Sequence, residues 1–205
     1  KLINPLAEID LDEYCNRNWL PLDMEKYSSS IIPFEYSTWG NADMRTPAVE
    51  FTFSDGSRIS NLVYKGYRIT DGKPALEGLP AVYCEAEDKV QTLSICLEDT
   101  LQNVDVFLTY SVFEEMDAIT RSVRIVNKGE RLLLDSVMSA MVDFYGHSEQ
   151  EILHLDGAWA RECHISRQPI AQGTQSIGSC YGCSSAFHNP FIAICDKDAT
   201  ENHGN

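Results

Sequence analysis

The chain has 205 residues, of which 43% are hydrophobic and 10% aromatic. It can therefore bury a sizeable core, which excludes the disordered class. Sixteen basic and 31 acidic residues give a formal net charge of −15, which disfavours nucleic acid and anionic membranes as partners because both would repel the chain.

Short β-rich segments that end in turns recur along the chain, and a helix is possible only near 6–14. Pro and Gly interrupt the other stretches long enough for a helix. Asp55-Gly56 and the turn 127–130 have the composition of hairpin turns. Strands joined by turns without intervening helices predict antiparallel pairing, and a two-sheet sandwich would bury their apolar faces. The strands are expected at 48–53, 59–64, 67–69, 91–97, 103–113, 119–126, 132–144, 151–155, 158–166 and 191–195.

The seven cysteines suggest a reducing compartment. Their number is odd, and Cys84, Cys96 and Cys195 lie in apolar, strand-like surroundings, where a free thiol behaves as a small hydrophobic group. Reduced thiols predict a cytoplasmic protein. Cys180 and Cys183 form a lone CxxC pair, and without a second pair they do not make a zinc site. We expect no metal and no cofactor.

No catalytic constellation can be assembled from the residues alone. Sugar cleavage generally needs two carboxyl groups on opposite sides of the bond. Glu114, Glu115 and Asp117 cluster at a turn, where solvated side chains are the simpler interpretation. Trp39 and Trp159 lie near charged residues, as in carbohydrate sites, but each could equally fill a core position. The residues alone therefore indicate an antiparallel β domain and no specific chemistry.

Six ordered motifs carry a more specific resemblance. Glu35-Tyr36 with the run 40–48 resembles the EYPxxGxxDFRxPA signature of the N-terminal domain of family 36 glycoside hydrolases, the microbial α-galactosidases. Residues 72–81 are similar to GKPxLxGLPA, 157–162 to GxWxRE and 179–191 to SxxGxSSxxxNPF, and two further matches lie at 92–99 and 117–127. Ser37 and Met44 depart from the signature, which has Pro and Phe there.

The resemblance implies a galactose mutarotase-like, antiparallel β-supersandwich, with 1–205 a single non-catalytic domain of a longer protein. A catalytic (β/α)₈ barrel and a C-terminal β domain would follow it, and both catalytic aspartates of the family lie in that barrel. No catalytic residue is therefore assigned here, and this chain alone is expected to be inactive. The chain starts without Met or a signal peptide and has a polar tail, so we expect both ends to be cuts, with the first strands missing.

The resemblance also implies a substrate and partners. The parent would be a retaining α-galactosidase that hydrolyses terminal α-galactosyl groups of melibiose- or raffinose-type oligosaccharides, and it would form a tetramer. In the family a loop of this domain reaches a neighbouring subunit's sugar site, and the acidic segment Ile9 to Glu25, with Asp12 foremost, is our candidate. Trp159 of the GxWxRE motif is the second candidate for substrate binding. For Asp43 and Arg45 we expect a structural salt bridge.

Two other functions fit the same sequence. One is a freestanding carbohydrate-binding module that uses Trp39 and Trp159 as stacking platforms. The other is a mutarotase-like sugar epimerase, since a fold does not fix a function. An epimerase would need a His and Glu pair facing one sheet, and the sequence identifies none.

Overall fold

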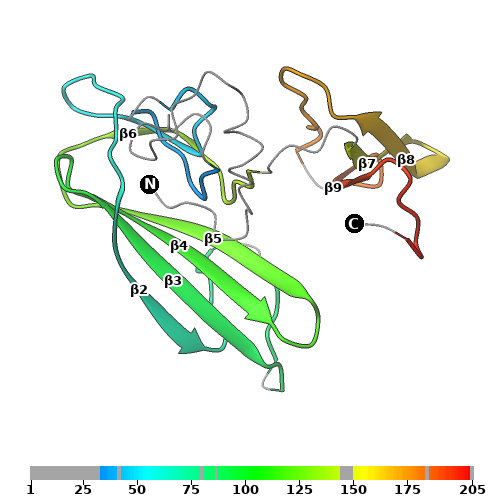
Figure 1. Ribbon diagram of the computed structural model, residues 1–205, viewed down its shortest axis with the longest axis horizontal. Coiled ribbons are helices and arrows are strands. Elements are labelled where there is room, and N and C mark those ends of the chain that lie inside the picture. Colours follow the sequence, from blue (N-terminus) through cyan, green and yellow to red (C-terminus); the bar gives the residue numbers. More distant parts are fainter. Residues whose placement is uncertain are drawn as a thin grey trace, which may run out of the picture. The chain divides into compact units, whose positions relative to one another are not determined.

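The computed structural model describes residues 33–40, 43–78, 81–85, 87–143, 150–182 and 185–203. These residues form nine β-strands and no helix (Figure 1). The described part therefore contains no helix long and apolar enough to cross a membrane. The helix expected near 6–14 lies outside it. The chain divides into two compact units, Lys1–Tyr145 and Gly146–Asn205, and each is described by itself.

The first unit contains two antiparallel sheets. β2 (Val63–Asp71), β3 (Val90–Asp99), β4 (Val104–Phe113) and β5 (Ala118–Asn127) form one sheet in the order β2-β3-β4-β5. β1 (Val49–Thr52) pairs with β6 (Leu133–Val137) to form the other. All named strand pairs of the described residues are antiparallel, as the turn spacing predicted.

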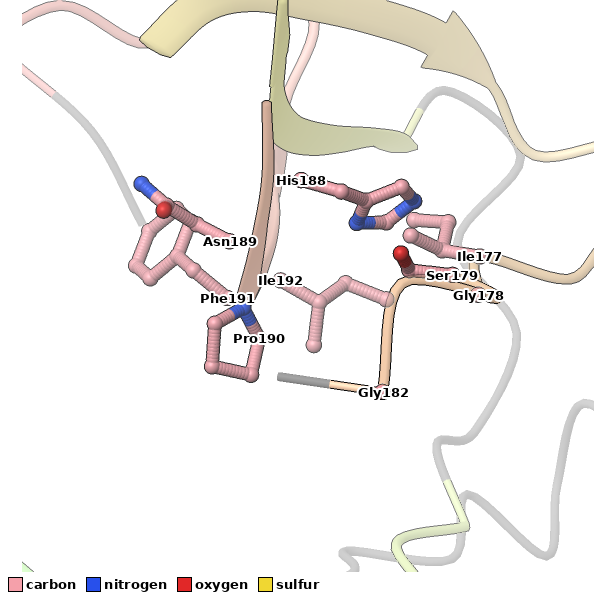
Figure 2. Close-up of a pocket in the computed structure, with 9 residues that line it drawn as sticks. All are labelled: Ile177, Gly178, Ser179, Gly182, His188, Asn189, Pro190, Phe191 and Ile192. Atoms are coloured by element: carbon pink, nitrogen blue, oxygen red, sulfur yellow. The ribbon is translucent and has the colours of Figure 1, made fainter. Parts of the chain in front are cut away.

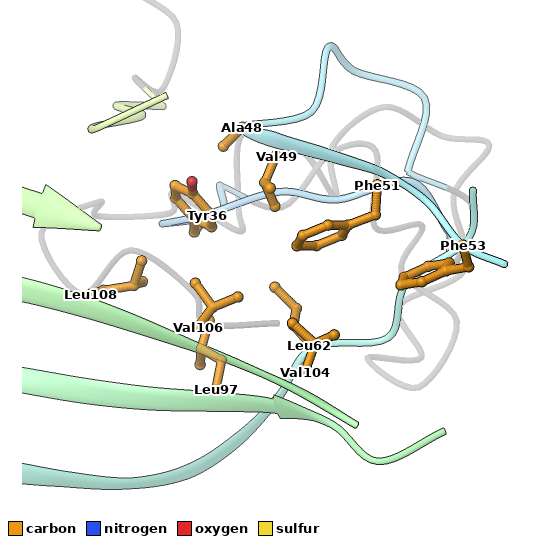
Figure 3. Packing of buried hydrophobic residues seen from close by; sticks show 10 residues of the cluster. All are labelled: Tyr36, Ala48, Val49, Phe51, Phe53, Leu62, Leu97, Val104, Val106 and Leu108. Atoms are coloured by element: carbon orange, nitrogen blue, oxygen red, sulfur yellow. The ribbon is translucent and has the colours of Figure 1, made fainter. Parts of the chain in front are cut away.

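The core lies between the two-stranded sheet and one face of the four-stranded sheet (Figure 3). Alternate residues of β4 point to this side, because successive side chains of a strand face opposite ways. The rings of Phe51 and Phe53 lie 5.6 Å apart, measured between centroids. The buried cluster consists of Tyr36, Ala48, Val49, Phe51, Phe53, Leu62, Leu97, Val104, Val106 and Leu108.

Several predicted elements differ from the structure. The two strands expected at 59–64 and 67–69 are one strand, β2, with an irregularity between Tyr64 and Gly66. The long strand expected at 132–144 is limited to β6. The turns at 54–57 and 127–130 form, but neither closes a hairpin, because β6 pairs with β1 rather than with its neighbour β5. Turn composition predicted the reversal of the chain without predicting the partner of each strand.

The second unit has a three-stranded antiparallel sheet of order β8-β7-β9. Its strands are β7 (Gln150–Ala158), β8 (Arg161–Pro169) and β9 (His188–Asp196). Pro190 is in β9, at an edge of this sheet, where the missing N–H of proline is tolerated. The loop between β8 and β9 and the start of β9 carry the predicted SxxGxSSxxxNPF motif.

Candidate functional site

In the first unit, side chains of two motifs, 35–48 and 117–127, make contacts between segments that are distant in the sequence. The hydroxyl of Tyr110 donates a hydrogen bond of 2.6 Å to the buried carboxylate of Glu35, which also pairs with Arg121. The hydroxyl of Tyr36 donates to the carbonyl of Met138 at 2.9 Å. Glu35, Tyr36 and Arg121 belong to two of the six motifs, and their contacts connect segments that are distant in the sequence.

Asp43 and Arg45 form the predicted salt bridge, with 2.9 Å between Arg45 Nε and Asp43 Oδ1. Arg45 also pairs with Asp143, and its guanidinium lies 4.7 Å from the centre of the Phe34 ring. Asp43 is buried. Through its contact with Asp143, Arg45 therefore joins the signature segment to the end of the first unit.

A hollow of about 550 Å³ in the second unit is our candidate site (Figure 2). Six residues of the 179–191 segment line it, and in Figure 2 the His188 ring, the Ser179 hydroxyl and the Ile192 side chain point into the same space. Its volume lies within the range of small-molecule sites, which is about 300–1,000 Å³. The lining consists of Ile177, Gly178, Ser179, Gly182, His188, Asn189, Pro190, Phe191 and Ile192.

Local turns shape this hollow. The hydroxyl of Ser179 accepts a hydrogen bond from the backbone N–H of Tyr181 at 3.2 Å. Gly182 has φ of +72°, a conformation that favours glycine. The carbonyl of Ser185 accepts from the N–H of His188 at 3.1 Å, which directs the chain into β9. The motif thus specifies the turns that set the wall of the hollow.

Two histidines and a carboxylate lie together in the same sheet. The rings of His154 and His188 are stacked, with centroids 6.4 Å apart. Nδ1 of the buried His154 has no hydrogen-bond partner among the described residues and lies 3.9 Å from Asp156 Oδ2, which accepts a hydrogen bond from Ser166. The sequence did not identify this group, because only the register of β7 with β8 and β9 brings its members together.

No Asp or Glu is among the described residues that line the hollow. A glycosidase centre needs two carboxyl groups around the bond, and the epimerase alternative needs a glutamate beside its histidine. Within the described residues, no group of three or more His, Cys, Asp or Glu side chains is arranged to hold a metal ion. The described lining offers the His188 ring and the Ser179 hydroxyl as hydrogen-bonding groups, but no carboxyl group for either reaction.

Trp159 lies at the tip of the β7–β8 hairpin and is 86% exposed. It does not line the hollow. The positive φ of Ala160 (62°) and the hydrogen bond from its N–H to Glu162 Oε1 at 2.9 Å shape the tip. Its indole is therefore packed into no core in the part of the chain described.

The remaining predicted residues lie outside the candidate hollow or outside the described part of the chain. Asp12 and the segment Ile9 to Glu25 lie outside the described residues. Glu114, Glu115 and Asp117 are exposed in the β4–β5 turn, as predicted. Trp39 is half-buried, and its Nε1 is buried without a hydrogen-bond partner among the described residues. Cys180 is a free, exposed thiol, and Cys183 is outside the described residues.

A family profile identifies the family to which the chain belongs. The family profile described as the glycosyl hydrolase family 36 N-terminal domain matches residues 7–205. The chain belongs to this family. The motif resemblance is thereby confirmed, and it covers nearly all of the chain.

Relatives of this family 36 domain are much longer than the chain. Alpha-galactosidase AgaA of Geobacillus stearothermophilus is 43% identical over 195 residues, which is 95% of this chain and 26% of that protein. Alpha-galactosidase C of Emericella nidulans is 42% identical over 171 residues, 83% of this chain and 22% of that protein. A crystal structure of an AgaA variant in complex with stachyose matches with a TM-score of 0.81 and 42% identity, over 89% of this chain and 26% of that one. The chain spans about a quarter of these relatives.

Proposed function

We propose that this chain is the non-catalytic N-terminal domain of a retaining α-galactosidase that hydrolyses terminal α-galactosyl groups of melibiose- or raffinose-type oligosaccharides. The observation that supports the non-catalytic role is that none of the described residues lining the candidate hollow carries a carboxyl group, because glycoside hydrolysis generally needs two. Family membership and relatives named α-galactosidase support the activity of the parent.

Within the parent, we propose that the domain supports assembly and substrate access. It would form a β-supersandwich, dock its own catalytic barrel and contribute to a homotetramer. The acidic segment Ile9 to Glu25, with Asp12 foremost, would reach a neighbouring sugar site. The exposed indole of Trp159 supports a second contact with the oligosaccharide, since sugars stack on aromatic rings.

A cytoplasmic location completes the proposal. Cys84, Cys96, Cys163, Cys180 and Cys195 are free thiols, and reduced cysteines are typical of the cytosol.

The experiment compares two polypeptides on a chromogenic α-galactoside. The 205-residue chain is expected to give no turnover, and the polypeptide encoded by the whole gene is expected to hydrolyse the substrate with retention of configuration. A gene that ends directly after Asn205, or turnover by the chain alone, would contradict the proposal. Gel filtration of the longer polypeptide tests the tetramer separately.

One observation favours a second function, a carbohydrate-binding module. Trp159 projects from a hairpin tip, as a stacking platform would. The half-buried Trp39 does not offer a second free ring. Binding of raffinose to the 205-residue chain, lost in Trp159→Ala and retained in Trp39→Phe, would support this function even without a catalytic barrel.

A further inference from the structure

The four-stranded sheet has a second face, opposite the core, that is polar. Cross-strand pairing aligns its side chains in rows. One row runs Arg68, Ser94, Thr109 and Ser122, and the next runs Thr70, Thr92, Ser111 and Thr120. We name this surface the polar face. None of its groups belongs to the candidate hollow of the second unit.

The polar face is hollowed over a volume of about 680 Å³. The hydroxyl of Thr92 donates a hydrogen bond of 2.7 Å to the carbonyl of Gly72. The hydroxyls of Thr92 and Ser111 are also hydrogen-bonded, with their oxygens 2.7 Å apart. These bonds hold the start of the β2–β3 connection against the face. Pro74 of that connection lines the hollow and also a smaller adjoining one of about 140 Å³. The motif segment 72–78 therefore borders a built recess.

One buried acceptor of this recess has no hydrogen-bond partner among the described residues. Asp105 is 6% exposed and lines the recess. Its Oδ2 pairs with Lys128 at 2.6 Å, whereas its Oδ1 has no hydrogen bond within the described residues and lies 3.7 Å from Lys65 Nζ. An unsatisfied buried carboxylate oxygen is costly, and a hydroxyl of a ligand would satisfy it.

The cations around the recess give its electrostatic preference. Lys65 pairs with Glu98 at 2.6 Å, and Lys128 pairs with Asp105, so the charges at that end cancel. Arg68 and Arg124, which line the recess, have no acidic partner among the described residues. The chain as a whole has a net charge of −15. Two guanidiniums without acidic partners nevertheless make this recess locally attractive to anions.

Arg124 is oriented for recognition of an acidic group. Its guanidinium carbon lies 4.2 Å from the centre of the Phe107 ring. Stacking on an aromatic face leaves the N–H groups at the edge of the guanidinium plane available, and this edge matches a carboxylate or a phosphate. The occupied face of Phe107 is correspondingly unavailable for stacking of a neutral sugar.

We propose that the polar face of the four-stranded sheet binds a sugar that carries a negative group, a uronate or a sugar phosphate. Arg124 and Arg68 bind the acidic group, and Asp105 Oδ1 together with the hydroxyls of Ser94 and Thr109 binds the sugar hydroxyls. The inference concerns binding without turnover and does not depend on the proposed hydrolase, so each can fail alone.

Calorimetric titration of the 205-residue chain with galacturonate, a galactose phosphate, galactose and inorganic phosphate tests the proposal. Galacturonate and galactose differ at one position, where a carboxylate replaces a hydroxymethyl group. We expect saturable binding of either or both anions at millimolar concentration or below, binding at least about tenfold weaker for galactose, and weakening of the anion complex by salt. The galactose phosphate separates the two sources of the acidic group.

Three variants test the residues. Arg124→Gln and Arg68→Gln are each expected to weaken binding of the anionic sugar about tenfold. Arg131→Gln is the matched control, because Arg131 is an exposed arginine that lines neither recess of the polar face. Arg68 lies on the edge strand β2 and is exposed, so its variant remains informative if Arg124→Gln fails to fold. Circular dichroism checks the fold of each.

Four outcomes would overturn the proposal. These are the absence of binding for both anions, equal affinity for galactose and galacturonate, equal weakening by the Arg131 variant, and equal affinity for inorganic phosphate and galactose phosphate. Equal affinity for the two phosphates would mean that the recess binds the charged group alone and makes no contact with the sugar hydroxyls.

Discussion

The hydroxyl of Tyr110 and the carboxylate of Glu35 are joined by a hydrogen bond of 2.6 Å across 75 residues of sequence. Glu35 is only 6% exposed and also pairs with Arg121. The bond therefore ties a signature segment to the middle of the four-stranded sheet and gives the buried carboxylate a second partner besides Arg121.

Removing this hydroxyl should destabilise the first unit. In Tyr110→Phe, Glu35 keeps Arg121 but loses one donor, and we expect the free energy of unfolding to fall by about 1–2 kcal/mol. Urea unfolding followed by circular dichroism measures it. Tyr83→Phe is the control, since Tyr83 is 91% exposed; it should stay within about 0.5 kcal/mol of the parent. Equal losses in the two variants would contradict the structural role of the bond.

The chain should lose stability at alkaline pH. Burial raises the pKa of Tyr36 to about 12, and burial together with the hydrogen bond to Glu35 raises the pKa of Tyr110. In the unfolded chain both tyrosine side chains have a pKa of about 10. Their stabilisation is therefore complete below about pH 10 and is lost as the pH rises from there toward the raised pKa values.

Urea midpoints across this alkaline range measure the slope. Tyr36→Phe also loses its bond to the carbonyl of Met138, so the slope with pH, and not the absolute stability, is the relevant quantity. We expect a shallower slope in Tyr36→Phe and an unchanged slope in Tyr83→Phe. A slope that Tyr36→Phe leaves unaltered would show that other groups cause the alkaline loss.

The core between the sheets can be tested with a matched pair of leucines. Leu97 is fully buried in the cluster, whereas Leu101, in the turn after β3, is 87% exposed. Leu97→Ala removes buried methyl groups and leaves a cavity, which should cost about 2–5 kcal/mol. Leu101→Ala should change stability by less than about 0.5 kcal/mol. Thermal and urea unfolding of both variants decide the question.

The strand composition and turn residues were sufficient to predict most strands and their antiparallel pairing. The run around Val104 to Phe113 alternates because one side faces the core. The pairing of β1 with β6 was not predictable, because 80 residues separate them and turn chemistry is local. The supersandwich and the single domain remain predictions that nothing in the structure tests.

The candidate site was predicted less well than the fold. The 179–191 motif contains residues that line the hollow, but the sequence alone assigns no role to its His188. His154 and His188 are 34 positions apart, and strand register alone stacks them. The polar face is likewise not predictable from the sequence, because Ser94 and Thr109 become neighbours only through the pairing of β3 with β4.

Gly157 of the GxWxRE motif should be intolerant of a side chain. A Cβ there would lie 2.3 Å from the carbonyl oxygen of Arg161, which belongs to the facing strand. Gly157→Ala should therefore displace the hairpin that carries Trp159, at a cost of about 1–3 kcal/mol. Gly178→Ala is the control, because a Cβ at Gly178 meets nothing within 4 Å. Hydrogen exchange of the β7–β8 amides should rise in the first variant and stay unchanged in the second.

The proposed borrowed contact of Asp12 is tested in the longer enzyme. If the acidic segment reaches a neighbouring sugar site, Asp12→Ala should lower kcat/KM on raffinose about tenfold, equivalent to about 1.4 kcal/mol of transition-state binding. Glu114→Ala removes an exposed carboxylate of the β4–β5 turn, outside this segment, and is expected to leave kcat/KM unaltered. Gel filtration of each variant separates loss of assembly from loss of a sugar contact. An Asp12→Ala enzyme with the parent's kcat/KM would remove this residue from the sugar site.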